Sequence, residues 1–302
     1  MTNAPDYNNI KYPAKFLDQY KIDGCINIDI ESFFERQECY PAFQEHLVEF
    51  KNLLIDLVNR GESKTFYKFG DGDYWFLRGI ASGSATPGRR ALAKSYSEIN
   101  HPQFVDGAKL CDYYTCEIYT HNRQFFREVI PNQKIHYPAE YGYALIANKW
   151  FFETFAGKIG LMGASTKMNL VSELMGAEQY QEYLGLEKFE DYISLPQKFA
   201  CDDLDATEAM VGEQLEQSSS KIFLMGMGHV KSGLIHRLKK YTDAVFLDVG
   251  AGIDAIAGII DIGRPYFGDW TNYQIDEKDL YEDVDYLGYE ALGKHILLER
   301  NL

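Results

Sequence analysis

The sequence contains no long apolar segment, no closely paired cysteines and no surplus of basic residues, and each absence excludes a class of protein. No uncharged stretch approaches the roughly 18 apolar residues of a membrane-spanning helix, and the first residues lack an apolar signal-peptide core, so we expect a soluble, cytoplasmic protein. The five cysteines are scattered without a C-x-x-C pair, which argues against a disulfide framework and a zinc knuckle. With 45 acidic and 30 basic side chains, the formal charge of −15 disfavours nucleic acid and anionic lipid as partners.

What the sequence does contain is a repeated pattern of strand, glycine turn and helix. The segments 158–166 (KIGLMGAST) and 221–229 (KIFLMGMGH) are short apolar runs that end in glycines, and a helix-like sequence follows each. A third apolar run, 244–250 (AVFLDVG), comes soon after, while 180–217 is interpreted as helices and connecting loops. Parallel strands deliver their chain to helices in this way, so we predict an α/β fold with a Rossmann-like, mostly parallel sheet flanked by helices.

We expect one main domain with an extension at each end. Residues 1–60 are predicted to form an N-terminal helical extension, whose last part is an amphipathic helix from residue 42 that stops before Gly61. Residues 61–268 form the predicted α/β domain. Residues 269–302 are predicted to be an acidic C-terminal extension with a solvated, charged surface.

The sharpest local motif is F-G-D-G-D, which follows a β-rich run. It consists of Phe69, Gly70, Asp71, Gly72 and Asp73. The glycines allow the backbone to bend, so the two carboxylates can point at one hard cation, Mn²⁺ or Mg²⁺, and hold a metal-bound diphosphate. The alternative is a plain turn in which an aspartate caps the following helix, which we expect to begin near Tyr74. The spacing alone leaves both interpretations open.

Two further groups of residues are candidates for binding phosphate. Arg89 and Arg90 precede a helical stretch, where they either neutralise phosphate oxygens or pair with acids at a solvated helix start. Gly163, Ser165 and Thr166 form the first glycine turn, whose backbone N–H groups can receive phosphate at the positive end of a helix. Close packing of helix against strand is the structural alternative for such glycines.

The second glycine turn, formed by Gly226, Gly228 and His229, has part of a dinucleotide-binding pattern. Asp248 follows at the end of the next strand, where an acid that binds a ribose would lie. The third glycine of G-x-G-x-x-G is replaced by Lys231. This partial match leaves a nucleotide- or S-adenosylmethionine-dependent Rossmann enzyme, such as a methyltransferase, as an alternative.

An apolar stretch near the end of the predicted domain carries three carboxylates, Asp248, Asp254 and Asp261. A charge is costly to bury unless it is paired, protonated or bound to something, so we expect at least one of these acids to be functional. Asp254 is either a general base at the carboxyl edge of the sheet or a helix cap.

Taken in order, these motifs resemble the glycosyltransferases of the GT-D type, a Rossmann-like family first met as a domain of unknown function in bacterial clusters that glycosylate surface adhesins. The resemblance covers about residues 60 to 265, and its most specific element is KFGDGDYWFLRG. The family usually has G-D-G-E, so Asp73 stands here in place of a glutamate. A second matching element is MGMGHVKSGLIHRLKKYTDAVFLDVGAGID, in which His229 and Val230 replace the usual small and hydroxyl residues.

The resemblance implies transfer of a sugar from a nucleotide diphosphate donor to an acceptor hydroxyl on a glycan or glycoprotein. It also implies Mn²⁺ or Mg²⁺ held by Asp71 and Asp73, to stabilise the charge of the departing diphosphate. The acceptor hydroxyl then needs a base, for which Asp254 is the first candidate and Glu140 the second. A non-catalytic relative that kept only the sheet is a further alternative, against which the presence of both aspartates argues.

Overall fold

The structure is a computed structural model that describes residues 43–79, 98–116, 126–130, 136–147, 149–196, 199–257, 259–260 and 295–296. The predicted extension before residue 43, the candidate phosphate ligands Arg89 and Arg90, and nearly all of the acidic segment 269–302 lie outside the described residues. Within the described ranges, no helix has the length and apolar character needed to cross a bilayer.

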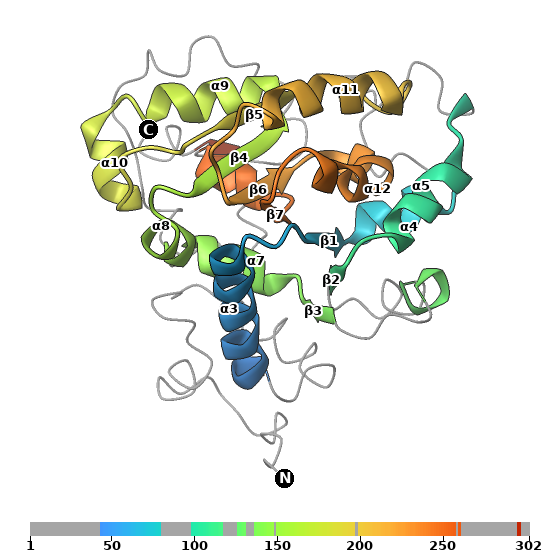
Figure 1. Cartoon of the computed structure of the whole chain (residues 1–302), viewed down its shortest axis with the longest axis horizontal. Coiled ribbons are helices and arrows are strands. Elements are labelled where there is room, and N and C mark those ends of the chain that lie inside the picture. Colours follow the sequence, from blue (N-terminus) through green and yellow to red (C-terminus); the bar gives the residue numbers. More distant parts are fainter. Residues whose placement is uncertain are drawn as a thin grey trace.

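Seven parallel strands in the described part of the chain form one sheet, which confirms the predicted Rossmann-like α/β architecture (Figure 1). They are β1 (Thr65–Phe69), β2 (Tyr113–Cys116), β3 (His136–Pro138), β4 (Ile159–Ala164), β5 (Tyr192–Leu195), β6 (Ile222–Gly226) and β7 (Val245–Asp248). Their order is β3-β2-β1-β7-β6-β4-β5, and every neighbouring pair is parallel. The first strand therefore lies beside the last, where the direction of strand addition reverses. Open α/β sheets bind ligands outside the carboxyl ends of their strands at such a reversal.

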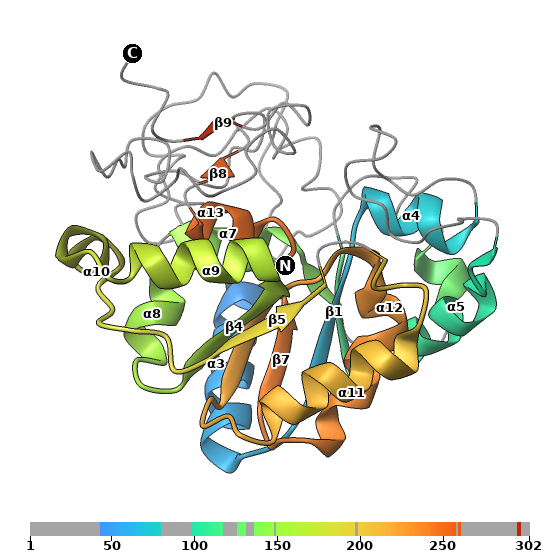
Figure 2. The same cartoon turned by 90° about the horizontal axis from the view of Figure 1, so that it is seen from above.

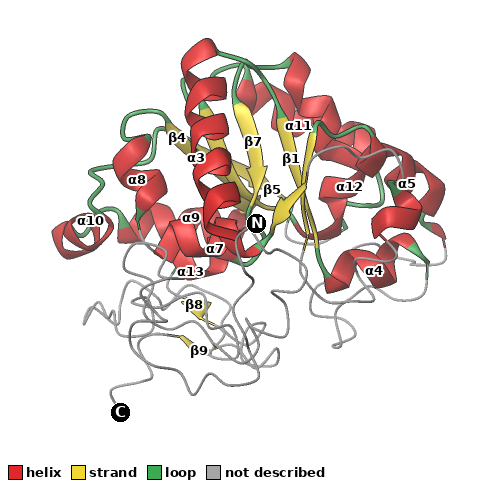
Figure 3. Ribbon diagram, turned by 90° about the horizontal axis from the view of Figure 1, so that it is seen from below, coloured by secondary structure: helices red, strands yellow, loops and turns green. Residues whose placement is uncertain are grey.

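Helices cover both faces of this sheet (Figures 2 and 3). One face packs against α3 (Phe43–Arg60), α7 (Glu140–Ala147), α8 (Trp150–Thr154), α9 (Ser165–Leu174), α10 (Glu178–Leu184) and α13 (Gly252–Ile256). The other packs against α4 (Asp71–Leu77), α5 (His101–Lys109), α11 (Leu204–Leu215) and α12 (Lys231–Leu234), with the 3₁₀ segments η3 (Gly228–Val230) and η4 (Ile235–Lys240). Side chains alternate along each strand, so Phe66 of β1 joins the first apolar cluster while Tyr67 and Phe69 join the second. A separate antiparallel pair consists of β8 (Ile259–Ile260) and β9 (His295–Ile296).

The helix α3 belongs to the packed body of the domain. It matches the predicted amphipathic helix and ends at Gly61, whose φ of 62° suits a glycine cap. Phe50 and Leu54 are fully buried, and the ring of Phe50 packs edge-on against Phe66 of β1 at a centroid distance of 5.8 Å. The division predicted at residue 60 therefore falls inside one packed unit, because α3 covers a face of the central strands.

Three strands go beyond what the sequence predicted. β2, β3 and β5 have only 4, 3 and 4 residues, too few to display the alternation that reveals a strand. β5 lies within 180–217, so the interpretation of that segment as helices and loops is wrong at Tyr192–Leu195. The chain after Gly228 also differs from expectation, because it forms η3, α12 and η4 in place of one regular helix.

Candidate functional site

Buried charges mark the carboxyl edge of the sheet. Among the described residues, seven charged side chains are buried, and six of them lie at or just beyond the carboxyl ends of β1, β4, β6 and β7. These six are Lys68, Asp73, Lys167, Lys231, Asp248 and Asp254. Three aspartates thus balance three lysines, in a chain whose formal charge is −15. Because buried charge is costly unless it is paired, such a concentration makes this edge of the sheet the candidate site.

Lys231 lies at the centre of this cluster. It is the first residue of α12, and its ammonium lies 2.6 Å from Asp248 Oδ2 and 3.1 Å from Asp73 Oδ2. It also donates a hydrogen bond to the carbonyl of Lys68 and lies 4.7 Å from the ring centroid of Tyr67. Burial alone would lower the pKa of Lys231, but the two carboxylates raise it above its ordinary value. The lysine is therefore a charged link between the segments that follow β1, β6 and β7.

Asp73 lies in the first turn of α4, because this helix begins at Asp71 and not near Tyr74 as predicted. Its Oδ2 accepts the N–H of Gly70, the residue before the helix, at 2.9 Å, and its Oδ1 accepts the hydroxyl of Tyr67 at 2.6 Å. Burial alone would raise the pKa of Asp73, but the charges of Lys231 and His229 and the two hydrogen-bond donors hold it below its ordinary value. The capping interpretation of the F-G-D-G-D motif thus describes Asp73.

The surroundings of the Asp73 carboxylate do not suit a role as a metal ligand. Donors engage both of its oxygens, the residue is 3% exposed, and an ammonium occupies the place where a cation would bridge Asp73 and Asp248. The side chain of Asp71 lies outside the described residues. Among the side chains that the structure describes, no three His, Cys, Asp or Glu residues converge as a metal site. The predicted Mn²⁺ or Mg²⁺ stays a prediction, and within this motif only Asp71 is left to bind it.

Asp248 ties the two central strands together. It ends β7, where its Oδ2 accepts the N–H of Lys68 in β1 at 3.2 Å and its Oδ1 accepts the N–H of Gly250 at 2.9 Å. With the ammonium of Lys231 also in place, Asp248 is only 3% exposed. A ribose would have to displace these donors, so the acid that the dinucleotide and S-adenosylmethionine alternative requires is already engaged within the protein.

The segments that follow β1 and β6 touch, as a single site requires. The imidazole of His229 stacks on Phe76 of α4, with ring centroids 4.6 Å apart and planes at 6°. A Cβ atom at Gly72 would lie 2.8 Å from Cε1 of His229, so the approach needs glycine. Gly228 has a φ of 60°, a left-handed conformation that favours glycine, and it is exposed at this edge. Three predicted binding residues thus share one edge.

The turn after β4 lies beside the turn after β6. Gly163 and Gly226 are paired in the sheet, and a Cβ at Gly226 would lie 2.8 Å from the carbonyl oxygen of Gly250. Close packing is therefore a sufficient reason for glycine at position 226. Ser165 and Thr166 open α9 at the same end of the sheet, and both are half-buried.

Two of the predicted ligand contacts serve the protein itself. Phe69 is fully buried in the apolar cluster and packs on Phe126 with ring centroids 5.4 Å apart, so its side chain serves the core, and its assignment to a binding surface stays a prediction. Gly70 gives its N–H to Asp73 and is the residue that precedes α4.

Asp254 and Lys167 form a second buried ion pair. Asp254 lies on α13, just beyond β7, and Lys167 lies in the first turn of α9; the two side chains are 4% and 10% exposed. A general base must reach its substrate, so this role for Asp254 requires Lys167 to release it. Glu140 begins α7 after β3, but its side chain lies outside the described residues. Both base assignments stay predictions.

None of the three buried lysines was among the predicted site residues, and two of them, Lys167 and Lys231, share a sequence context. Each follows a glycine turn and enters the first turn of the next helix, in GASTK (Lys167) and in GMGHVK (Lys231). The start of a helix is an unfavourable place for a cation, because the helix dipole is positive there. A lysine repeated at this position is therefore a sequence signal for carboxylates nearby.

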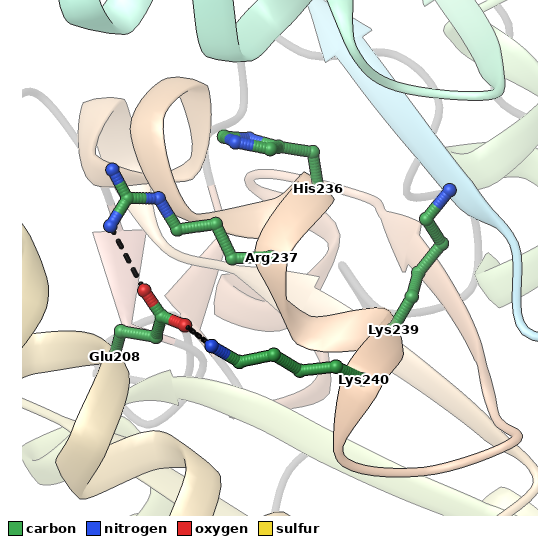
Figure 4. A pocket seen from close by; sticks show the side chains of 5 residues that line it. All are labelled: Glu208, His236, Arg237, Lys239 and Lys240. Atoms are coloured by element: carbon green, nitrogen blue, oxygen red, sulfur yellow. Dashed lines mark hydrogen bonds and ion pairs between the residues drawn. The ribbon is translucent and has the colours of Figure 1, made fainter.

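An open pocket of about 600 Å³ lies at the opposite edge of the sheet (Figure 4). Its lining residues come from α11 and from η4, the segment that leads into β7: Glu208, His236, Arg237, Lys239 and Lys240. Glu208 bridges Arg237 at 2.9 Å and Lys240 at 2.5 Å, and Lys239 pairs with Asp112 at 3.0 Å. Because each lysine and arginine of this pocket has an acidic partner, the pocket offers an anion little unbalanced positive charge.

No protein-family model and no curated protein matches the sequence. A solved structure similar to this chain is described as a new glycosyltransferase (DUF1792) from Streptococcus sanguinis. The two chains are 13% identical with a TM-score of 0.45, and the alignment covers 80% of this chain and 95% of the other. Similarity at this level carries no argument about activity, and the architecture is established by the strand order itself.

Proposed function

We propose that the protein is a glycosyltransferase that moves a sugar from a nucleotide diphosphate donor to a hydroxyl of a glycan or glycoprotein. The observation that carries this proposal is the balanced cluster of buried charge at the carboxyl ends of β1, β4, β6 and β7. An anionic donor that approaches an acidic protein needs a region where negative charge is compensated, and this edge combines three buried lysines with the glycine turns. The sequence resemblance supplies the reaction class.

In this proposal the diphosphate lies against the turns after β4 and β6. Backbone N–H groups at Ser165 and Thr166, which open α9, and at the turn of Gly228 take phosphate oxygens. Cleavage of the anomeric bond places negative charge on the departing diphosphate, and fixed donors stabilise that charge as it develops. Arg89 and Arg90 are proposed to contact the remaining phosphate oxygens.

The acceptor hydroxyl is proposed to lose its proton to a carboxylate, with Asp254 as the first candidate and Glu140 as the second. Asp254 has the position at the carboxyl edge, and its partner Lys167 would have to move aside when the acceptor binds. A divalent cation enters the proposal through Asp71 alone. No step depends on a metal held by Asp73.

Thermal unfolding with a panel of ligands tests this function. UDP-sugars and GDP-sugars are compared with S-adenosylmethionine, each with and without Mn²⁺, and release of nucleoside diphosphate is followed with the sugars that bind. We expect one class of nucleotide sugar to raise the melting temperature and to be consumed. Stabilisation by S-adenosylmethionine alone would contradict the proposal and favour the methyltransferase alternative.

A further inference from the structure

We propose that the ammonium of Lys231 is a built-in cation that takes the place of a divalent metal between Asp73 and Asp248. The proposal deepens the proposed function, on which it rests for the identity of the ligand: the diphosphate would be bound without a metal ligated by Asp73. Lys231 is then a positioning residue that holds the F-G-D-G-D segment beside the turn after β6.

The distances are those of ion pairs between an ammonium and carboxylates. Lys231 Nζ lies 2.6 Å from Asp248 Oδ2 and 3.1 Å from Asp73 Oδ2. A Mg²⁺ ion would need oxygen ligands at about 2.0–2.1 Å in an octahedral arrangement, for which two oxygens and a buried amine leave no room. The cation of this site is therefore supplied by the chain itself.

The donors and acceptors around Lys231 are balanced. An ammonium has three N–H groups, and three acceptors surround this one: the carboxylates of Asp73 and Asp248 and the carbonyl of Lys68. The residue is 6% exposed, so little of its ammonium is open to a ligand. The lysine therefore acts through the groups that it holds and does not touch the substrate.

The carboxylates are closed to a metal from their other sides as well. Asp73 accepts the Tyr67 hydroxyl and the Gly70 N–H, while Asp248 accepts the backbone N–H groups of Lys68 and Gly250. The Tyr67 hydroxyl also lies 2.8 Å from the hydroxyl of Ser232, the residue after Lys231. While Lys231 is in place, a metal could enter only by displacing its ammonium and disturbing these contacts.

This network has a consequence for the approach of a phosphate. If Asp73 and Asp248 were unpaired, two negative charges would face the donor from the ends of the central strands. The ammonium compensates them and also fixes the start of α4 against the turn after β6, where Gly72 and His229 meet. Exposed backbone at these turns can then face an anion without a bridging metal.

Titration with Mn²⁺ alone, followed by calorimetry, tests the inference on the full chain. We compare the wild type with Asp73→Asn, and use Asp71→Asn as the matched control in the same motif. Asp73→Asn should leave the Mn²⁺ affinity within twofold of the wild type, because Asp73 is not a ligand. Any Mn²⁺ binding at this motif should instead fall with Asp71→Asn. A loss of tenfold or more in Asp73→Asn would overturn the inference.

The variant Lys231→Met makes the test sharper. Removing the ammonium leaves the carboxylates of Asp73 and Asp248 facing each other without a cation between them. This variant should therefore gain a Mn²⁺ site at least tenfold tighter than any in the wild type. The double variant with Asp73→Asn should lose that site. A folded Lys231→Met that gains no Mn²⁺ affinity would count against the proposal. If circular dichroism shows that Lys231→Met does not fold, the Mn²⁺ titrations of the wild type and of Asp73→Asn still test the inference. Because no nucleotide is present, failure of the proposed function leaves this result unaffected.

Discussion

The imidazole of His229 lies parallel to the ring of Phe76, with centroids 4.6 Å apart, and this stack joins the turn after β6 to the helix after β1. The pair formed by Lys231 and Asp73 connects the same two segments through charge. Two stretches that are distant in the sequence thereby form one wall at the carboxyl edge of the sheet. A ligand bound there would be sensitive to changes in either stretch.

The close approach of Gly72 to His229 leads to the first prediction. In Gly72→Ala the new methyl group would lie 2.8 Å from Cε1 of His229 and should displace the imidazole from Phe76. Alanine is favoured over glycine within a helix by about 1 kcal/mol, which offsets part of the steric cost, so the fold should persist. We expect donor affinity, measured by calorimetry, to fall at least tenfold.

Gly185→Ala is the matched control for this change. Gly185 follows α10, has a φ of 68° and has open space around it, so alanine there should lower the free energy of unfolding by about 1 kcal/mol and leave donor binding intact. The opposite outcome, tight binding in Gly72→Ala, would show that the contact with His229 does not shape the site.

The burial of Asp73 predicts a pH-dependent contribution to stability. Its pKa in the folded state lies below the ordinary value of 3.8, so the ionised group stabilises the fold fully above pH 3.8, and this contribution is lost as the pH falls through the folded-state pKa. At pH 7, Asp73→Asn should lower the free energy of unfolding by about 2 kcal/mol, the scale of a charged hydrogen bond. Urea unfolding from pH 7 down to pH 3 should show this difference shrinking below pH 3.8. A difference that is constant with pH would argue against the ionised pair.

The second ion pair predicts strong coupling between Lys167 and Asp254. Because both side chains are almost fully buried, Lys167→Met or Asp254→Asn alone should cost about 3–5 kcal/mol of stability, since each removes one partner of a buried ion pair. The double variant should recover a large part of that loss. Additive losses in a double-mutant cycle would contradict the pairing.

The same variants separate the structural role of Asp254 from the catalytic one. If Asp254 is the general base, Asp254→Asn should retain donor affinity at a temperature where it is folded, while transfer falls by about two orders of magnitude or more. Lys167→Met serves as the control, because it disturbs the pair but keeps the carboxylate. Full transfer activity in Asp254→Asn would move the role to Glu140.

The sequence was sufficient to predict the central strands, because β4, β6 and β7 lie in apolar runs that contain or end in glycine or aspartate, and β1 is a β-rich run followed by Gly70. The outer strands β2, β3 and β5 could not be predicted, since YYTC, HYP and YISL are too short to show a period. The start of α4 was also misplaced. Gly70 and Gly72 favour a turn by their composition, whereas the pairing of Asp73 with the N–H of Gly70 extends the helix back to Asp71.

The sequence points to the acids of this candidate site but not to their lysine partners. Asp73, Asp248 and Asp254 were recognised as unusual acids, but their lysine partners come from other strand turns and meet them only through the order of the sheet. Lys231 was noticed only as the residue that interrupts G-x-G-x-x-G. The lysine that interrupts the G-x-G-x-x-G pattern is the charge that pairs with Asp73 of the F-G-D-G-D motif.

The most direct test of a nucleotide site at the carboxyl edge is hydrogen–deuterium exchange of the wild-type chain in EDTA, with and without UDP or GDP. The account predicts that the nucleotide that binds slows amide exchange in residues 70–77 and 226–234 and leaves 204–215 and 235–240, beside the pocket at the opposite edge, unchanged. Protection confined to the opposite edge would contradict the location of the site. Protection that appears only with Mn²⁺ and disappears in Asp73→Asn would contradict the role of Lys231.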